Sequence, residues 1–196
     1  MIAPARIQFL KERISLYDDQ TAYRELFVAF YPSLFQFANG FIKSRQSAEE
    51  VVSDVFINIW EKRSKLQHVS NLKLYLFTST RNAALNHLER NNKMVTTDIS
   101  ELPVSLGSLN YDPEKILITA EMKKMIHDAV QKLPARCKLI FKLVKEDELK
   151  YREVADLLKL SVKTVEAQMT IALKKIGEVV SFDLTRTISA TRSSKK

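Results

Sequence analysis

The chain has 196 residues, of which 45% are hydrophobic, and it carries a formal net charge of +8. That length and apolar share can build one ordinary hydrophobic core or two small ones. Only three glycines and five prolines occur, and β-hairpins and dinucleotide-binding turns need glycine at positive φ, so the composition favours helices joined by short loops. The first prediction is therefore an all-α protein.

Charge and cysteine content restrict the partners and the compartment. Basic residues lie on both sides of an acidic stretch at 96–115, which predicts two separate contacts with a polyanion, although a purely solubilising charge gives the same total. The single cysteine, Cys137, cannot form an internal disulfide and no secretion signal is evident, so a reducing cytoplasm is expected. Lys or Arg interrupts every apolar run before about 18 residues, so direct membrane insertion is not expected.

A wide amphipathic pattern runs from Asp18 to Lys43, with large apolar residues three and four positions apart. This is the spacing of one helix face. Asp18 or Asp19 can cap the helix by accepting backbone N–H bonds. Pro32 falls inside the pattern and should kink the helix or begin a second one, so we predict two adjoining helices.

The next segment has a capping-box signature. Ser47 and Glu50 stand in the order S-x-x-E, so a helix is predicted to start there. Its apolar positions between Val51 and Trp60 define one face of the helix. The other face is polar and acidic, and it carries Glu50, Ser53, Asp54, Asn58 and Glu61.

A polar connection at 64–70 precedes a third amphipathic helix, predicted from Leu72 to about Asn92. Residues 93–113 mix polar residues, proline and glycine without sustained periodicity, which predicts a flexible interdomain linker. The expected organisation is therefore two small helical domains, 1–92 and 114–180, on either side of this linker.

Periodicity resumes at Ile116 and continues to Leu133, and Pro134 is well placed in the first turn of another helix. Two short helices follow at 151–158 and 161–176, and they form a predicted helix-turn-helix with Ser161 as the second N-cap. The alternative is an αα-hairpin that never touches DNA. Residues 181–196 are polar and basic, so a disordered tail is predicted.

Four segments together form a larger pattern. They are A-E-E-V-V-S-D-V-F-I-N-I-W at 48–60, Y-L-F-T-S-T-R-N-A-A-L-N-H-L at 75–88, L-P-A-R-C-K-L-I-F at 133–141 and Y-R-E-V-A-D-L-L-K-L-S-V-K-T-V-E at 151–166. In this order and spacing the chain resembles the extracytoplasmic-function (ECF) sigma factors of RNA polymerase, over roughly residues 20–178. The resemblance implies a first domain that binds polymerase and reads the −10 promoter element, and a second domain that reads the −35 element.

The resemblance also implies site residues by position. Those that match the polymerase-docking helix are Glu50, Ser53, Asp54 and Trp60, with a buried structural role as an equal alternative for Trp60. Those expected at the −10 element are Asn82, Asn86, His87, Arg90 and Lys93. Those expected at the −35 element are Lys163, Thr164, Glu166, Ala167, Gln168, Thr170, Ile171 and Lys174.

Two further −10 features are expected. The 65–71 loop would capture an extruded base, which offsets unstacking that costs on the order of a few kcal/mol. Lys62, Arg63 and Lys65 would hold backbone phosphates together with Arg90 and Lys93, although a solvated surface explains any one lysine equally well.

The implied partners are core RNA polymerase, through the β′ clamp helices and the β flap, promoter DNA, and an anti-sigma factor that is possibly membrane-anchored. No cofactor or metal is implied. The sequence departs from the family pattern in the turn before the recognition helix, where Lys159 replaces the usual glycine and a left-handed backbone would cost roughly 1 kcal/mol. The outer recognition helix also lacks arginine, so base preference does not carry over.

Three other classes compete with this interpretation. A response-regulator output domain has a similar helix-turn-helix, but it would need an α/β domain before it, and residues 1–95 show no alternating strands. An enzyme is disfavoured because Cys137 has no nearby histidine and no phosphate-binding glycine loop exists. A plain helical bundle would fold alike but would not co-purify with core polymerase.

Overall fold

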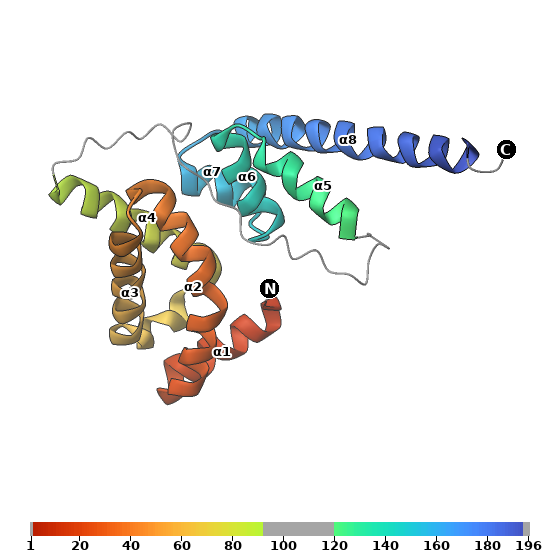
Figure 1. Ribbon diagram of the computed structural model, residues 1–196. Coiled ribbons are helices and arrows are strands. Elements are labelled where there is room, and N and C mark those ends of the chain that lie inside the picture. The colour runs from red at the N-terminus through yellow and green to blue at the C-terminus, as the bar shows by residue number, and fades with distance from the viewer. Residues whose placement is uncertain (1, 92–119, 194–196) are drawn as a thin grey trace. The chain divides into compact units, whose positions relative to one another are not determined.

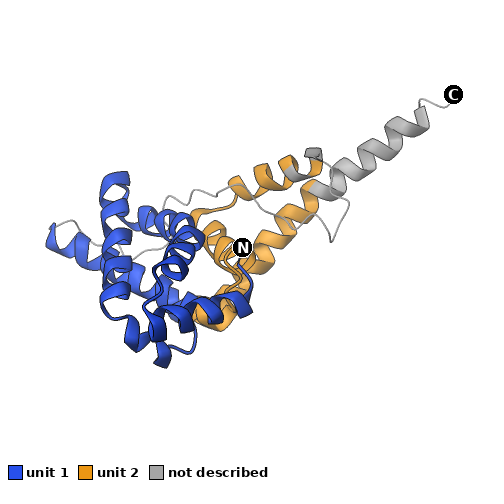
Figure 2. Ribbon diagram, turned by 90° about the horizontal axis from the view of Figure 1, so that it is seen from below, with its two compact units in different colours: residues 1–105, 156–159 blue, residues 106–155, 160–196 orange. Residues whose placement is uncertain are grey.

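The computed structural model describes residues 2–91 and 120–193, with side chains described up to Val179. Every regular element in these ranges is helical, which confirms the all-α prediction. The chain divides into two compact units, residues 1–105 with 156–159 and residues 106–155 with 160–196 (Figure 2). The predicted linker at 93–113 lies outside the described residues.

The first unit contains α1 (Pro4–Tyr17), α2 (Gln20–Ile42), α3 (Arg45–Glu61), the 3₁₀ helix η1 (Arg63–His68) and α4 (Leu72–Arg90) (Figure 1). The polar connection predicted at 64–70 is thus largely η1, and its Leu66 side chain is buried. Helix α1 was not predicted. Its buried residues Ile7, Leu10 and Ile14 follow the three- and four-residue steps of one helix face.

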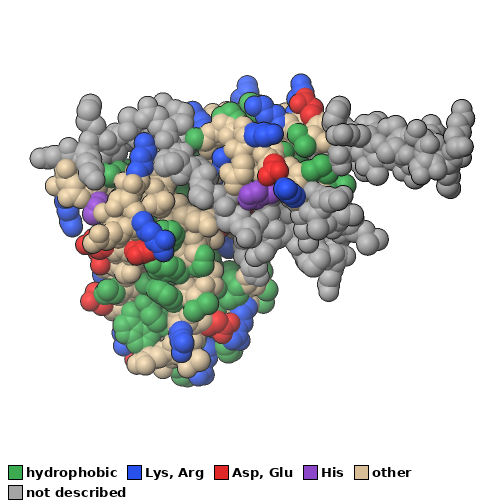
Figure 3. All heavy atoms as spheres, in the orientation of Figure 1, with side chains coloured by type: hydrophobic (Ala, Val, Ile, Leu, Met, Phe, Trp, Pro, Cys, Tyr) green, Lys and Arg blue, Asp and Glu red, His purple; other side chains and the backbone are tan. Residues whose placement is uncertain are grey.

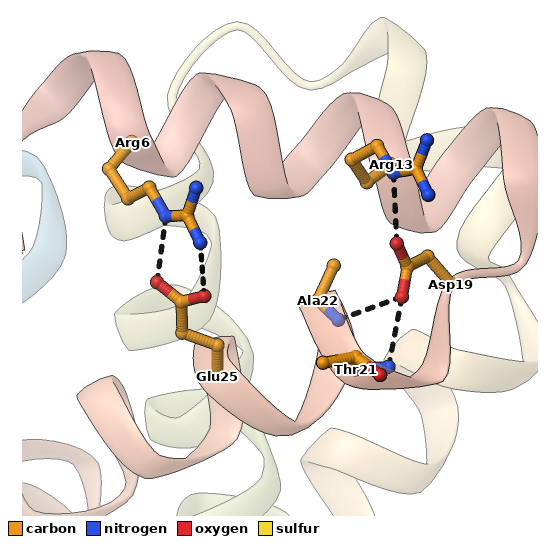
Figure 4. A network of polar contacts seen from close by, with 6 residues as sticks. All are labelled: Arg6, Arg13, Asp19, Thr21, Ala22 and Glu25. Atoms are coloured by element: carbon orange, nitrogen blue, oxygen red, sulfur yellow. Dashed lines mark hydrogen bonds and ion pairs between the residues drawn. The ribbon is translucent and has the colours of Figure 1, made fainter.

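Helix α2 corrects the prediction of two adjoining helices, because it continues without a break through Pro32. The proline removes one backbone hydrogen bond, at a cost of about 3 kcal/mol. Large side chains on both sides of it, such as Phe30 and Leu34, are buried in the core and offset that cost. The predicted cap is confirmed at Asp19, whose carboxylate accepts the Thr21 and Ala22 N–H groups at 2.9 and 3.0 Å (Figure 4).

Helix α3 begins two residues before the predicted Ser47 start. Its N-cap is Ser44, whose hydroxyl accepts the Ser47 N–H at 3.5 Å. Lys43 ends α2 in the left-handed conformation, with φ of 55°, so the connection between the helices is only two residues long and the cap falls earlier. The predicted capping box at Ser47 and Glu50 is therefore wrong, and Glu50 is an exposed residue inside the helix.

Helices α2, α3 and α4 enclose the core of the first unit, where Phe37 packs edge-on against Phe77 with ring centroids 5.2 Å apart. Phe56 from α3 and Leu76 from α4 are fully buried in the same unit. The outward faces of α3 and α4 are thereby left mainly to polar residues.

The second unit contains α5 (Ala120–Gln131), α6 (Ala135–Lys145), α7 (Tyr151–Leu158) as far as Ala155, and α8 (Val162–Ser193). Both predicted boundaries hold, because Pro134 precedes α6 and the Ser161 hydroxyl accepts the Thr164 N–H at 3.0 Å. The tail prediction is wrong for 181–193, since α8 continues to Ser193. No glycine or proline follows Gly177, and extending an existing helix is far easier than starting one.

Charged side chains are buried near the end of α6. The Lys142 ammonium lies 2.8 Å from the Asp147 carboxylate and 3.7 Å from that of Glu146. Burial raises the pKa of Glu146 to about 7, which the attraction of Lys142 only partly opposes. The turn that leads to α7 is therefore built around a desolvated charge cluster.

Candidate functional site

The polar face of α3 is exposed as predicted. Glu50 and Asp54 are exposed and lie one helical turn apart, so their carboxylates share a face. Ser53 is half-buried, and its hydroxyl donates to the Glu49 carbonyl at 2.8 Å. The acidic character of this face therefore rests on Glu50 and Asp54, with Ser53 oriented inside its own helix.

Sequence reasoning missed Ile57 on the same face. Its side chain is 54% exposed, and it lies seven residues after Glu50 and three after Asp54, which is the helical phase of that face. The helical spacing could have identified Ile57, because this residue falls outside the apolar positions that were assigned to the core face of the helix. Figure 3 shows hydrophobic side chains at the surface of the first unit, next to acidic and basic ones.

An open hollow of about 440 Å³ adjoins this residue, lined by Gln20, Tyr23, Ile57 and Trp60. Trp60 is half-buried, with its ring 4.9 Å from that of Tyr23. The Arg63 guanidinium lies 4.7 Å from its ring centroid. Trp60 thus packs against Tyr23 on one side and lines the hollow on the other.

The cations before α4 differ in how they are used. Arg63 forms an ion pair with Asp18 and donates to the Trp60 carbonyl at 3.0 Å, so its guanidinium already has structural partners. Lys62 and Lys65 are exposed. Of the three expected phosphate-holding cations that precede α4, Lys62 and Lys65 therefore have their ammonium groups at the surface.

Helix α4 presents the predicted −10 residues in one row. Asn82, Asn86 and Arg90 are exposed and follow each other at four-residue steps. His87 is half-buried, and its Nε2 lies 2.9 Å from the Asn91 amide nitrogen. Lys93 lies outside the described residues. The helix thus brings together two amides and a cation along one outer stripe.

An aromatic residue extends this stripe toward the start of α4. Tyr75 is 38% exposed and lies seven residues before Asn82, two helical turns away. Sequence reasoning did not single it out as a site residue. Its helical phase agrees with the amides, so it adds a stacking surface to their row.

The helix-turn-helix turn takes the conformation that was in doubt. Lys159 has φ of 56°, in the left-handed region where glycine is usual. The Leu160 N–H donates to the Ala155 carbonyl at 2.9 Å and closes the turn. The family turn is therefore formed without its glycine.

The outer face of α8 carries most of the predicted −35 set. Val165, Met169 and Ala172 point into the core of the second unit. The predicted residues that are exposed are Lys163, Glu166, Ala167, Thr170, Ile171 and Lys174. Thr164 and Gln168 are half-buried. The Thr164 hydroxyl lies 2.8 Å from the Ser161 hydroxyl in the cap. The backbone carbonyl of Gln168 accepts a hydrogen bond from the Cys137 thiol at 3.2 Å.

Two family models match the chain, Sigma-70 region 2 over residues 26–94 and Sigma-70 region 4 over residues 123–176. The RNA polymerase sigma-H factor of Pseudomonas aeruginosa is 21% identical over 187 residues, covering 92% of this chain and 96% of the relative. The ECF RNA polymerase sigma-E factor of Escherichia coli is 23% identical over 180 residues, covering 88% and 93%. The chain belongs to the sigma-70 family, in its ECF group. It is an RNA polymerase sigma factor that acts in promoter recognition.

The matched regions coincide with the surfaces described above. The region 2 match holds α3, η1 and α4 of this sigma factor, and the region 4 match holds the helix-turn-helix. Helix α1 and the last part of α8 lie outside both matches. In the described residues, no helix is long and apolar enough to cross a membrane, and no group of three or more potential metal-binding side chains occurs.

Two solved structures are also similar. CnrH in complex with the cytosolic domain of CnrY is 20% identical, with a TM-score of 0.49 over 91% of this chain and 97% of that one. The sigma factor RpoE in complex with the anti-sigma factor NepR, from Bartonella quintana, is 21% identical, with a TM-score of 0.48 over 82% and 98%.

Proposed function

We propose that this sigma factor divides its work among three exposed helix faces: α3 docks on the polymerase β′ clamp helices, α4 reads the −10 element and promotes melting, and α8 reads the −35 element. The observation that carries the proposal is that each face is free of core packing and holds the side chains that its role requires. The protein itself performs no catalysis in this scheme.

The α3 face suits a basic helical partner. Glu50 and Asp54 supply charge, and Ile57 with the Trp60 hollow supplies an apolar contact beside that charge. Protein interfaces combine an aromatic centre with a polar rim in this way, and the charges steer association. The β flap would be a second polymerase contact, made by the second unit.

The α4 stripe suits an unpaired DNA strand. Asn82 and Asn86 can donate to and accept from base edges, while Arg90 and the exposed lysines before α4 can hold phosphates. Tyr75 offers a ring on which a base can stack. Contacts that favour unpaired bases would offset the cost of melting the duplex.

The α8 face suits the major groove. Lys163, Glu166 and Thr170 occupy successive turns of an exposed helix that follows a formed helix-turn-helix turn. Glutamate accepts hydrogen bonds from cytosine, and threonine serves either base type. The −35 sequence read by this chain would accordingly differ from that of family members with arginine at these places.

An inhibitory partner is also part of the proposal. One of the similar structures is described as a sigma factor bound to an anti-sigma factor. A comparable protein, either free or anchored in the membrane, would hold this chain inactive in the cytoplasm by covering its polymerase and DNA surfaces. Affinity capture from uninduced cells should recover it, and recovery of no inhibitor would contradict this part.

The docking face is tested by Asp54→Arg, which reverses one exposed charge. Affinity for core polymerase should fall at least tenfold while the circular dichroism spectrum is unchanged, because the side chain makes no core contact. Glu12→Arg is the matched control, since it reverses an exposed charge on α1. Equal affinities for both variants would reject the assignment of α3.

Promoter recognition is tested by run-off transcription on genomic fragments with the assembled holoenzyme. Fragments transcribed only when this chain is added should share two sequence elements separated by a constant spacer. Failure of the wild-type chain to co-purify with core polymerase at low salt would overturn the proposal as a whole.

A further inference from the structure

Helix α1 lies before the region 2 match, yet it is packed tightly against a segment inside that match. It contacts both α2 and η1, and it buries Leu10 and Ile14 completely. Two ion pairs, Arg6 with Glu25 and Arg13 with Asp19, hold it against α2 (Figure 4). Its contact with η1 is of a different kind.

Lys11 of α1 contacts the loop that follows η1. Its side chain is buried, with 8% exposed, and its ammonium donates to the backbone carbonyl of Val69 at 3.0 Å. A lysine is rarely buried without a strong partner, and a charged donor makes a stronger hydrogen bond to a carbonyl than a neutral donor does. This bond crosses 58 positions of the chain, so it joins the N-terminal helix to the 69–71 loop directly.

The same loop is fixed at both of its ends. Before it, the Val69 N–H donates to the Leu66 carbonyl at 3.0 Å, at the end of η1. After it, the Asn71 side chain accepts the Leu74 N–H at 3.0 Å and caps α4. Ser70 lies between these points and is exposed. The loop therefore presents a short exposed segment on a constrained backbone.

We propose that Lys11 is a positioning residue for promoter opening: α1 acts as a brace that holds the 69–71 loop in the shape that receives an extruded −10 base. The inference rests on the proposed function, in which the 65–71 segment meets the unpaired strand. A loop already held in its bound shape loses less conformational entropy when it captures a base. Removing the brace should therefore weaken capture without affecting polymerase docking on α3.

The test uses full-length chain assembled with core polymerase and a single-stranded oligonucleotide of the non-template −10 strand, taken from a promoter found by run-off transcription. Lys11→Met keeps the buried stem and removes the donor. Arg6→Met is the matched control, because it removes an α1 cation that forms its ion pair with Glu25 of α2 and not a bond to the 69–71 loop. Ser70→Asp places a negative charge on the exposed loop and reports whether the loop meets DNA at all.

The expected result is a three- to tenfold loss of oligonucleotide affinity for Lys11→Met and for Ser70→Asp, with Arg6→Met near wild type and core binding equal in all variants. A loss for Ser70→Asp with none for Lys11→Met would overturn the brace and leave the proposed −10 surface standing. No loss for Ser70→Asp would remove the loop from the DNA site and the brace with it. Equal losses for Lys11→Met and Arg6→Met would mean that α1 contributes only fold stability, which also overturns the brace.

Discussion

The two units differ in where they keep their charges. In the first unit the core is aliphatic and aromatic, and its buried lysine, Lys11, bonds to a backbone carbonyl. In the second unit Lys142 is buried against the carboxylates of Asp147 and Glu146. Apolar packing is insensitive to pH, whereas a desolvated carboxylate is not. The comparison predicts that pH and the substitutions described below change the stability of the second unit. In the first unit, substitutions of exposed residues should instead change the contacts with DNA and polymerase and leave stability nearly unchanged.

The largest expected effect is that of Lys142→Met in the second unit. The substitution leaves the Asp147 carboxylate buried without its 2.8 Å ammonium partner, and breaking a buried pair in this way costs about 3–5 kcal/mol. Hydrogen exchange of α6 and α8 in the full-length chain should speed up accordingly.

Trp60 is the only tryptophan in the sequence and lies in the first unit. Its fluorescence should therefore report an unchanged unfolding midpoint for that unit. Lys145→Met is the matched control, because Lys145 is exposed on the same helix. Equal destabilisation by both variants would show that the buried Lys142–Asp147 pair is not what makes the second unit sensitive to substitution.

The next effect tests the first unit, where Asn82→Ala and Asn86→Ala should impair function without loss of stability. Each removes hydrogen bonds to an unpaired base worth about 1–3 kcal/mol, so open-complex formation should fall about tenfold. Alanine is the better helix former, so unfolding is not the expected cause. Permanganate footprinting measures opening, and a premelted promoter should rescue little of the defect.

Gln8→Ala, which removes an exposed side-chain amide on α1, is the control and should open promoters normally. Wild-type opening by both α4 variants, at limiting protein and physiological salt, would return Asn82 and Asn86 to the role of surface polar residues. The first unit would then offer no example of a substitution that weakens DNA contacts while leaving stability unchanged.

Glu146 gives the pH dependence of the second unit. Its pKa is about 7 in the folded protein and near 4.5 when unfolded, so the folded state binds the proton more tightly. The free energy of unfolding is therefore highest below pH 4.5, falls as pH rises from 4.5 to 7, and is level above 7. After allowance for solvent screening the fall is on the order of 1 kcal/mol.

Glu146→Gln should abolish that part of the pH profile, measured by hydrogen exchange of α6 corrected for intrinsic rates at pH 5.5 and pH 8. The profile of the first unit should be the same in both proteins. A wild-type second unit that gains stability toward pH 8 would show that Glu146 is not the group that titrates.

Much of this organisation could be predicted from the sequence, because periodicity reports which face of a helix is buried. The helix-turn-helix and the Asp19 and Ser161 caps followed from spacing and residue type, whereas the α4 amides were expected from the family resemblance. Errors arose where tertiary contacts outweigh local signals. Pro32 is tolerated because its neighbours are buried, and the Ser44 cap prevails over the better motif at Ser47 because α2 ends at Lys43. No local signal joins Lys11 to Val69, since their bond depends on the fold.

The smallest expected effect concerns the turn between α7 and α8. Lys159→Gly should stabilise the helix-turn-helix by about 0.5–1 kcal/mol, because φ of 56° is strained for a residue with Cβ, although the freedom glycine gains when unfolded offsets part of this. Gly177→Ala is the counterpart: no atom lies within 4 Å of the added Cβ, so it should give a similar gain through helix propensity. One change acts in the turn before α8 and the other inside that helix, 18 positions further along the chain, so their effects should add. Denaturation followed by helix α8 exchange would measure both, and −35 DNA affinity should stay at the wild-type value because neither side chain is in the proposed contact set. If Lys159→Gly proved destabilising, the contacts of the lysine side chain would stabilise the turn by more free energy than the left-handed backbone costs.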